Sequence, residues 1–331
     1  MALLSIDSIA ENVAHLHGCV LTIGNFDGVH RGHQTILAKL AKEASERRTS
    51  SVALTLEPHP VRHFRPDGPP FRLTTPGQKI SLLRQYGVEA PIALQFDEST
   101  ASILPERFVS EILLAAFEPQ YVLVGYDFNY GKDRRGDPAL LEAICQARGV
   151  DVFVQTAVQD DSTVISSTAV RKALRDADMA GANVLLGRPF AVVGTVEEGE
   201  GRGRVLGFPT ANLAVENELI PSSGVYATWL EVEGAARPWR AITNIGVRPT
   251  FDGEGTTVET FVLEQGLNEH QLDLYGKRVA LHFTSYIRPE MRFPGPDALI
   301  SQINNDIAVC RELHSAGLPS EWVPQADWAQ Y

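Results

Sequence analysis

Two hydrophobic periodicities divide this 331-residue chain, and this division constrains its fold more than any other feature. Up to about residue 175, short β-branched runs alternate with segments whose apolar residues recur at helical spacing. Such repetition predicts a parallel sheet with helices on both faces, where ligands bind beyond the carboxyl ends of the strands. The expected strands are Cys19–Ile23, Ser51–Leu56, Ala90–Leu94, Tyr121–Val124 and Asp151–Val154, and the expected helices are His33–Ala44, Pro76–Tyr86, Pro105–Phe117, Pro138–Gln146 and Ser167–Leu174.

After residue 188 the pattern changes to short strands separated by Gly, Pro and Asn turns. This pattern predicts an antiparallel β-barrel with a single clear helix, Pro296–Leu313, near the end of the chain. We therefore expect two domains, residues 1–182 and 183–331, joined by a polar stretch between about 177 and 185. The expected barrel strands are Phe190–Val196, Gly224–Glu231, Arg240–Asn244, Val258–Leu263 and Arg278–Phe283.

Charge and cysteine content limit the classes of partner and the cellular compartments that fit this chain. The formal net charge is −12, and neither half is basic, which argues against a nucleic-acid partner but leaves small anionic ligands open. The three cysteines, Cys19, Cys145 and Cys310, form no CxxC pair, as is typical of a reducing compartment. No apolar run approaches the roughly 20 residues that span a bilayer, and the start has no basic n-region. We expect a cytoplasmic protein without a membrane partner.

The segment Gly24-Asn25-Phe26-Asp27-Gly28-Val29-His30-Arg31-Gly32-His33 follows the first expected strand and opens the first helix. Backbone N–H groups at a helix start bind anions, and two histidines three residues apart can face one ligand. They can donate hydrogen bonds as charge builds on a transferring nucleotidyl group. An isolated HxxH pair is more often a capping and packing feature, or half of a zinc site. Zinc needs three or four ligands, which no HExxH pattern or cysteine pair supplies here.

A second polar segment, Ser166-Ser167-Thr168 with Arg171 one turn later, follows the fifth expected strand. Hydroxyls at a helix start and an arginine can bind phosphates. Taken alone, the segment is simply a good N-cap, and this is the commoner explanation of such a sequence. Because the segment and the histidine loop are expected at the same edge of the sheet, a shared nucleotide site becomes the stronger hypothesis.

Four motifs of the amino-terminal half resemble a known family. The stretches GNFDGVHRGH and ISSTAVR resemble the nucleotidyltransferase superfamily, which has a Rossmann-like α/β fold. With TLEPHP (Thr55–Pro60) and VGYDFNYG (Val124–Gly131), they resemble the FAD synthetase half of bacterial bifunctional riboflavin kinase/FAD synthetases. Two positions depart from the family pattern: Leu56 stands where Phe is common, and Asn129 where many relatives have Arg. These departures concern how the flavin packs, not the reaction.

The resemblance implies roles for the matching residues. His30 and His33 would hold the ATP phosphates and act in catalysis, Asp127 would sit in the nucleotide site, and Phe64 and Tyr130 would flank the flavin ring. The remaining nucleotide-binding residues implied by these motifs are Gly24, Asn25, Phe26, Asp27, Gly28, Ser166, Ser167, Thr168 and Arg171.

The carboxy-terminal half contains a glycine-rich stretch, Gly199 to Leu213. Its glycines, Gly203 and Gly207 among them, leave N–H groups that can wrap a phosphate. Thr210 and Asn212 offer neutral oxygens to a hard cation such as Mg²⁺. Without further context, a glycine-rich hairpin followed by a proline turn explains the stretch better than a named reaction does.

Here the resemblance is sharper, because several motifs match in order and spacing. GFPTANL, NIGVRPTF (Asn244–Phe251), VETFVLE (Val258–Glu264), DLYGK (Asp273–Lys277) and IRPEMRF (Ile287–Phe293) resemble the riboflavin kinase domain of the same family. The resemblance implies that Thr210 and Asn212 hold the Mg²⁺ of ATP, that Glu259 is the general base and that Arg288 contacts the flavin. Taken alone, Glu259 reads as an exposed strand carboxylate and Arg288 as a solvated turn charge.

The resemblance thus predicts an enzyme that phosphorylates riboflavin to FMN and adenylylates FMN to FAD, using ATP in both steps, with Mg²⁺ as the cation that accompanies ATP. Its partners would be riboflavin, FMN and ATP, and FAD would be a product; the oligomeric state is open. Two other functions are considered. One is nucleotidyl transfer to another phosphorylated metabolite, since the histidine loop does not choose the acceptor. The other is a non-catalytic flavin-binding regulator.

Overall fold

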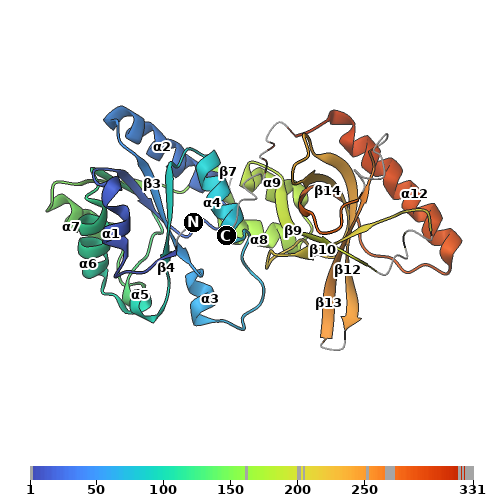
Figure 1. Cartoon of the computed structure of the whole chain (residues 1–331), viewed down its shortest axis with the longest axis horizontal. Helices are drawn as coiled ribbons and strands as arrows, with labels where there is room; N and C mark the ends of the chain where they lie inside the picture. Colours follow the sequence, from blue (N-terminus) through green and yellow to red (C-terminus); the bar gives the residue numbers. More distant parts are fainter. Residues whose placement is uncertain are drawn as a thin grey trace. The chain divides into compact units, whose positions relative to one another are not determined.

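The computed structural model describes residues 3–160, 163–199, 203, 206–250, 253–264, 273–319, 322 and 324 of the chain. They form two compact units, one of mixed α/β structure and one built on a β-barrel (Figure 1). The first unit comprises the chain up to residue 70 and residues 76–165; the second comprises residues 71–75 and the chain from residue 166. These packing units divide the chain earlier than residue 182. The boundary at 182/183, which concerns independent folding and activity, stays a prediction.

The first unit is built on a six-stranded parallel sheet in the order β1-β4-β3-β2-β5-β6, which confirms the predicted architecture. The edge strand β1 was not expected, because two residues are too short to show a periodicity. A short antiparallel pair, β7 (Gln159–Asp160) and β8 (Thr163–Val164), follows the sheet. The strands of the sheet are β1 (Leu3–Leu4), β2 (Val20–Ile23), β3 (Ser51–Glu57), β4 (Ala90–Gln95), β5 (Tyr121–Gly125) and β6 (Asp151–Gln155).

Helices cover both faces of this sheet. Leu21, Leu54 and Val124 face one side, where they share a hydrophobic core with apolar residues of α1, η2 and α7. Helix α2 contacts β2, β3 and β5 from the other side, where Lys39 lies 4.3 Å over the ring of Phe153. The helical segments of this unit are α1 (Ile9–Val13), η1 (Ala14–Leu16), α2 (Arg31–Arg47), α3 (Pro60–Phe64), α4 (Pro76–Gln85), α5 (Glu98–Ser102), α6 (Pro105–Arg107), the π-helix η2 (Phe108–Ala115), η3 (Lys132–Arg134) and α7 (Pro138–Gln146).

The local sequence explains where α7 begins. Pro138 occupies its first turn, where a missing N–H costs nothing, and Asp137 Oδ1 accepts a hydrogen bond from the Leu140 backbone N–H at 2.9 Å. Asp137 is therefore the N-cap of α7. The cysteines Cys19, Cys145 and Cys310 are all buried and free.

The second unit contains a closed six-stranded antiparallel barrel in the order β10-β13-β12-β11-β14-β9, as predicted. Strand β10 was not expected, because it lies inside the glycine- and proline-rich motif. Three buried threonine hydroxyls are hydrogen-bonded in a row across β11, β12 and β13. Thr243 Oγ1 lies 2.8 Å from Thr228 Oγ1 and donates to Thr260 Oγ1 at 3.0 Å. The strands are β9 (Phe190–Glu197), β10 (Ala211–Val215), β11 (Gly224–Val232), β12 (Trp239–Thr250), β13 (Gly253–Val262) and β14 (Arg278–Arg288).

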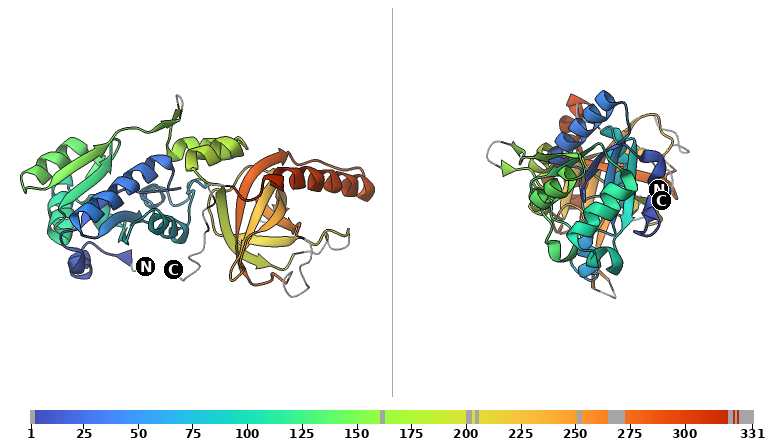
Figure 2. Two further views of the ribbon diagram at one scale, coloured as in Figure 1. Left: turned by 90° about the horizontal axis from the view of Figure 1, so that it is seen from above. Right: turned by 90° about the vertical axis from the view of Figure 1, so that its left-hand side faces the viewer.

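The described part of the second unit also contains the helices α8 (Ser167–Arg175), α9 (Met179–Leu186) and the predicted terminal helix α12 (Pro296–Leu313), which η4 (His314–Ala316) continues. Helix α12 runs along the outside of the barrel (Figures 1 and 2), where Ile307 and Cys310 pack against Ala227 of β11. The strand face that carries Ala227 is therefore the one that faces α12.

His314, just after α12, is expected to make the second unit sensitive to acid. Burial, helped by the positive charge of Arg240, lowers the pKa of His314 to about 4, and its Nε2 has no hydrogen-bond partner among the described residues. Unfolded, the imidazole takes up a proton near pH 6.5, so stability present above that pH is lost as the pH falls toward 4. The loss from this residue should be on the order of 3 kcal/mol.

Urea unfolding at pH 7 and pH 4.5 measures this effect. The variant His314→Phe keeps an aromatic ring against Trp229, whose ring centroid lies 4.9 Å from that of His314, and it cannot titrate. It should lose less stability between the two pH values than the native protein does. His282, whose pKa burial also lowers, is present in both proteins and cancels in the comparison. Equal losses would remove His314 as a source of the acid sensitivity.

Candidate active sites

The histidine loop, Gly24–His30, connects β2 to α2 at the carboxyl edge of the sheet. His30 is the N-cap of α2, and its Nδ1 accepts a hydrogen bond from the backbone N–H of His33 at 3.3 Å. In the neutral ring the proton then resides on Nε2, which makes Nε2 a donor. The rings of His30 and His33 stack with centroids 3.7 Å apart. The structure thus brings the two predicted histidines together at a helix start that favours an anion.

Buried backbone strain shapes this loop. Phe26, Gly28 and Val29 have φ values of 49°, 81° and 41°, a region that is costly for a β-branched residue such as Val29. Phe26 and Val29 are almost completely buried, so their packing holds the unusual backbone in place. A Cβ on Gly24 would lie 3.2 Å from the Phe26 ring, and one on Gly32 would lie 3.1 Å from the His30 ring. Strain maintained in this way is characteristic of ligand-binding loops.

A buried polar chain supports the loop from β3 and α4. Lys79 Nζ lies 2.5 Å from Glu57 Oε1 and donates to Thr55 Oγ1 at 3.0 Å, and Thr55 donates to the Asn25 carbonyl at 3.2 Å. The side chains of Lys79 and Glu57 are 4% and 10% exposed. Sequence analysis quoted Thr55 and Glu57 within a motif but missed Lys79, because nothing in a helical lysine indicates burial. The ion pair extends the site beyond the predicted residues.

Replacing Lys79 with Met should destabilise the first unit by about 3–5 kcal/mol, because it removes the ammonium that pairs with the buried Glu57 carboxylate. Chemical denaturation at pH 7 measures the change. Lys42→Met is the matched control, since Lys42 pairs at 3.8 Å with Glu46 on the exposed side of α2 and such pairs contribute about 0–1 kcal/mol. Equal stability of the two variants would show that the Lys79–Glu57 pair is not a critical support.

Asp127 lies two residues beyond β5, the neighbour of β2 in the sheet. Its Oδ1 is 3.1 Å from the place that a Cβ on Gly125 would occupy, so the carboxylate folds back over the end of the strand. Asn129 Nδ2 donates to the Asp127 carbonyl at 2.8 Å and shapes this turn. The strand order therefore brings Asp127 and the histidine loop to the same edge of the sheet.

The ring of Tyr130 belongs to the core of the first unit. It is 6% exposed and lies 5.1 Å from Phe128, stacked, and 5.6 Å from Phe108. Burial raises the pKa of its hydroxyl, which has no hydrogen-bond partner among the described residues. A Cβ on Gly136 would lie 2.6 Å from the ring. Phe128, half-buried on top of this stack, is an aromatic residue that the sequence analysis did not single out.

Phe64, at the end of α3, is 66% exposed, which is unusual for a phenylalanine and fits a ligand-facing ring. It meets Phe96 edge-on at 5.8 Å, and His63 lies 5.1 Å from Phe64 and 5.3 Å from Phe96. Phe96, just after β4, was missed because a single aromatic residue after a strand carries no periodic signal. The three rings form an aromatic cluster at the carboxyl ends of β3 and β4.

The segment Ser166–Arg171 begins α8 in the second packing unit. Ser166 Oγ accepts a hydrogen bond from the Ala169 N–H at 3.2 Å, so it is an N-cap, as the simpler interpretation held. Arg171 Nε donates to the Phe71 carbonyl at 2.7 Å. In the first unit, the carbonyl of Ile165, the residue before this segment, lies 3.4 Å from where a Cβ on Gly32 would be.

In the barrel, strand register places three polar residues in one row. Asn212 of β10 is directly opposite Glu259 of β13, and Glu259 is directly opposite Asn244 of β12. Directly paired residues share a face of the sheet, so these side chains are neighbours. Phe261, two residues after Glu259, packs on the core under α12, which puts the row on the same outer face. Asn244 was present in a quoted motif but was not assigned a role.

Two glycines, Gly199 and Gly203, lie very close to Asn212 and Thr210. A Cβ on Gly199 would lie 1.9 Å from Asn212 Nδ2, and one on Gly203 would lie 2.3 Å from the Phe208 carbonyl and 3.1 Å from Thr210 Oγ1. The glycine-rich loop therefore approaches Thr210 and Asn212 more closely than any side chain would allow. Gly207 has a φ of 87° and makes the turn before the proline. Gly201, which belongs to the same loop, lies outside the described residues.

Arg288, at the end of β14, binds α12 rather than solvent. Its guanidinium forms a bidentate pair with Asp306, with Nε–Oδ1 at 3.0 Å and Nη2–Oδ2 at 2.7 Å, and the Asp306 side chain is 5% exposed. The interpretation of Arg288 as a solvated turn charge is therefore wrong. Its predicted contact with a flavin stays a prediction.

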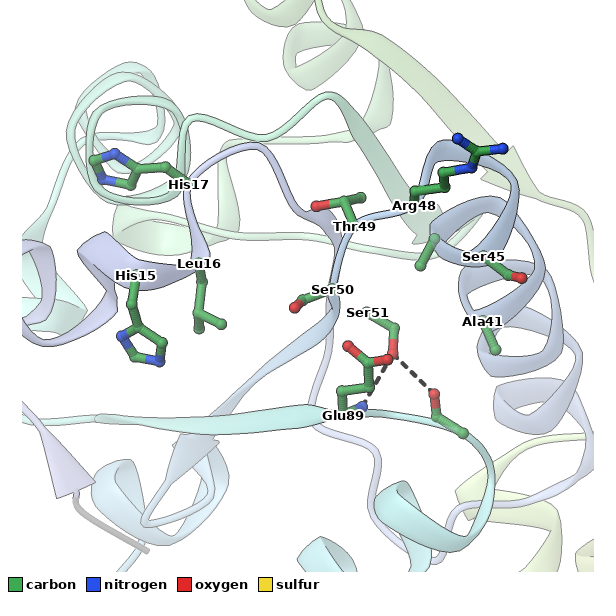
Figure 3. A pocket seen from close by; sticks show the side chains of 12 residues that line it. His15, Leu16, His17, Ala41, Ser45, Arg48, Thr49, Ser50, Ser51 and Glu89 are labelled. Carbon is green, nitrogen blue, oxygen red and sulfur yellow. Dashed lines mark hydrogen bonds between the residues drawn. The ribbon is translucent and has the colours of Figure 1, made fainter.

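A cavity of about 640 Å³ lies at the opposite end of the sheet, near the start of β3 (Figure 3). His15, Arg48 and Glu89 line it, and Ser51 Oγ donates to the Gly87 carbonyl at 2.9 Å and accepts from the Glu89 N–H at 3.0 Å. None of the predicted site residues lines this cavity. In parallel α/β sheets the chemistry belongs to the carboxyl ends of the strands, so size alone does not make it the active site.

Comparison with known proteins matches both units. A family model described as FAD synthetase matches residues 12–169, and one described as riboflavin kinase matches residues 186–314. The chain is also similar to proteins named bifunctional riboflavin kinase/FMN adenylyltransferase. One from Escherichia coli K12 is 38% identical over 92% of this chain and 95% of its own length. One from Pseudomonas fluorescens is 40% identical over 89% and 93%.

A solved structure matches the whole fold. A crystal structure described as a macrolide-efflux protein from Streptococcus pneumoniae superposes with a TM-score of 0.83 and 28% sequence identity, covering 94% of this chain and 99% of that one. Among the described residues of the present chain, no helix has both the length and the apolar character needed to cross a membrane.

A parallel α/β unit with a histidine loop at its carboxyl edge, followed by a barrel with an Asn–Glu row under a glycine loop, defines a two-domain nucleotide-using transferase. The family models and the relatives at 38–40% identity make the assignment specific. The chain belongs to the family of bifunctional riboflavin kinases/FMN adenylyltransferases.

Proposed function

We propose that this chain phosphorylates riboflavin to FMN and then adenylylates FMN to FAD, using ATP in both reactions. The observation that carries the proposal is the presence, in one chain, of both family domains with a phosphate-accepting geometry in each. In the first unit this is the stacked pair His30 and His33 at the start of α2. In the second it is the Asn212–Glu259 register pair beneath the glycine loop.

In the kinase reaction, Glu259 accepts the proton of the riboflavin 5′-hydroxyl as that oxygen attacks the γ-phosphorus of ATP. Thr210 and Asn212 would hold the Mg²⁺ that accompanies ATP, and this cation would neutralise charge that develops on the phosphate. The absence of side chains at Gly199 and Gly203 supports this assignment, because it lets backbone N–H groups approach the phosphates. Half-buried Glu259 lies beside Asn212, and this register pair supports the proposal that the two residues act on the same ATP.

In the adenylyl transfer, a phosphate oxygen of FMN attacks the α-phosphorus of a second ATP and pyrophosphate leaves. Positioning and hydrogen-bond donors are the main catalytic contributions, and no covalent enzyme intermediate is needed. His30 Nε2 and His33 act as these donors, and the backbone of Gly24–Gly28 surrounds the nucleotide. Asp127, Ser166, Ser167, Thr168 and Arg171 complete the nucleotide site, Gly203 and Gly207 bind ATP in the kinase site, and Phe64, Tyr130 and Arg288 contact flavin.

The test is product analysis by chromatography with defined substrates. Riboflavin and ATP should yield FMN and ADP, and FMN and ATP should yield FAD and pyrophosphate. Consumption of ATP only with a different phosphorylated acceptor would identify the first unit as a nucleotidyltransferase for that metabolite. Flavin binding without ATP consumption would identify a regulator. Omission of Mg²⁺ should stop both reactions. The cytoplasmic location expected from the sequence stays a prediction.

A further inference from the structure

Two consecutive residues of β3 hold the start of the histidine loop. The Gly24 N–H donates to the Leu54 carbonyl at 3.1 Å, which extends the pairing of β2 with β3 by one residue. One residue further along each segment, Thr55 Oγ1 donates to the Asn25 carbonyl at 3.2 Å. Because Thr55 is completely buried, water does not compete for this hydroxyl.

Lys79 determines where the proton of the Thr55 hydroxyl points. Its ammonium donates to Thr55 Oγ1 at 3.0 Å, and a lysine ammonium can only donate. The single proton of the hydroxyl is therefore left for the Asn25 carbonyl. Since the ammonium is charged and buried, it also polarises the hydroxyl and strengthens that hydrogen bond. Glu57 fixes the ammonium in turn, at 2.5 Å.

The hydrogen bond from Thr55 sets the direction of the next backbone N–H. The Asn25–Phe26 peptide is trans and planar, so its carbonyl and its N–H point to opposite sides. With the carbonyl held against β3, the Phe26 N–H points away from that strand. Among the described residues this N–H donates to no protein acceptor, although Phe26 is 1% exposed. Buried residues seldom leave an N–H unpaired, and a loop N–H at this edge of the sheet can donate to a phosphate oxygen.

The backbone of Phe26 needs this support. Its φ of 49° lies in the left-handed region, which is unfavourable for any residue that carries a Cβ. Rotation of the peptide between residues 25 and 26 would relieve the strain and turn the N–H toward β3. The hydrogen bond from Thr55 to the Asn25 carbonyl would be lost in that rotation, so Thr55 opposes it.

We infer that Thr55, oriented by Lys79, is a positioning residue for the adenylyl transfer, because it holds the Asn25–Phe26 peptide with the Phe26 N–H directed at a phosphate of ATP. This rests on the proposed function, in which the backbone of Gly24–Gly28 surrounds the nucleotide. Thr55 touches no substrate and acts through the peptide that it holds. All of these residues belong to the first unit.

The variant Thr55→Val in the full-length enzyme tests this, because valine has the shape of threonine but no hydroxyl. Its KM for ATP in FAD formation should rise about tenfold, the effect of one lost hydrogen bond to a charged group. The kcat of that reaction and the KM for FMN should change little, and FMN formation from riboflavin should be unaltered. Thr55→Ser keeps the hydroxyl and should have the native KM for ATP. A packing role predicts the reverse order, since serine removes a methyl group and valine does not.

Thr22→Val is the matched control. Thr22 lies on β2 of the same sheet and is also completely buried, but its Oγ1 donates to the Leu123 carbonyl at 2.9 Å rather than to the loop. This variant should leave the KM for ATP unchanged. If Thr55→Val does not fold, Thr55→Ala removes the same hydroxyl and carries the same expectation.

A native KM for ATP without the Thr55 hydroxyl, or an equal rise in Thr22→Val or in Thr55→Ser, would overturn the positioning role. A native enzyme that makes no FAD would instead overturn the proposed function, and this inference with it.

Discussion

Glu259→Gln is expected to abolish FMN formation while FAD formation from supplied FMN continues. The amide keeps the shape of the carboxylate but cannot take the hydroxyl proton, and general-base assistance contributes ~10²–10⁴-fold. The effect should be confined to the kinase reaction because Glu259 lies on β13 of the barrel. Chromatographic rates with riboflavin and with FMN as alternative substrates measure both activities on one preparation.

Glu264→Gln provides the control for this prediction. Glu264 belongs to the same motif, but its Oε1 accepts a hydrogen bond from the Arg240 N–H at 3.1 Å and it does not pair with Asn212. A glutamine can keep that hydrogen bond, so kinase activity should persist. Near-native riboflavin phosphorylation by Glu259→Gln would remove Glu259 from the mechanism.

Removing either histidine should block FAD formation and let FMN accumulate. Loss of a donor to transition-state charge costs about 3–4 kcal/mol in comparable sites, or roughly 10²–10³-fold in rate. His30 also caps α2, so His30→Asn is the better variant there: asparagine is a good N-cap and preserves the helix start without the imidazole. His33→Ala serves for the second position. Steady-state FAD formation and thermal melting should be measured together.

These variants separate catalysis from packing. His15→Ala is a control, because His15 lies in the same unit, exposed, at the opposite end of the sheet. It should keep both activities. If His30→Asn retained FAD formation, or if both activities fell together with the melting temperature, the histidines would have a packing role only.

The sequence alone determined the architecture, because periodicity of two kinds and glycine loops after strands are local signals that tertiary contacts did not override. Strand–helix alternation predicted the parallel sheet, and strand–turn alternation predicted the barrel with α12. Strands β1 and β10 were not predicted, β1 because it is too short to show a periodicity and β10 because it lies among glycine and proline residues. The proximity of His30 and His33 was predictable for the same reason, because they lie three residues apart at one helix start.

Tertiary structure alone decided which charged residues are engaged and with what. Sequence separations of 18 between Arg288 and Asp306 and of 100 between Arg171 and Phe71 leave no periodic trace, so neither pairing could be predicted. The buried Lys79–Glu57 pair and the Arg72–Glu218 pair likewise depend on which segments pack together. A local sequence pattern specifies which face of its helix or strand a residue occupies. Which residue it contacts there depends on how segments distant in the sequence pack together, and that information is not local.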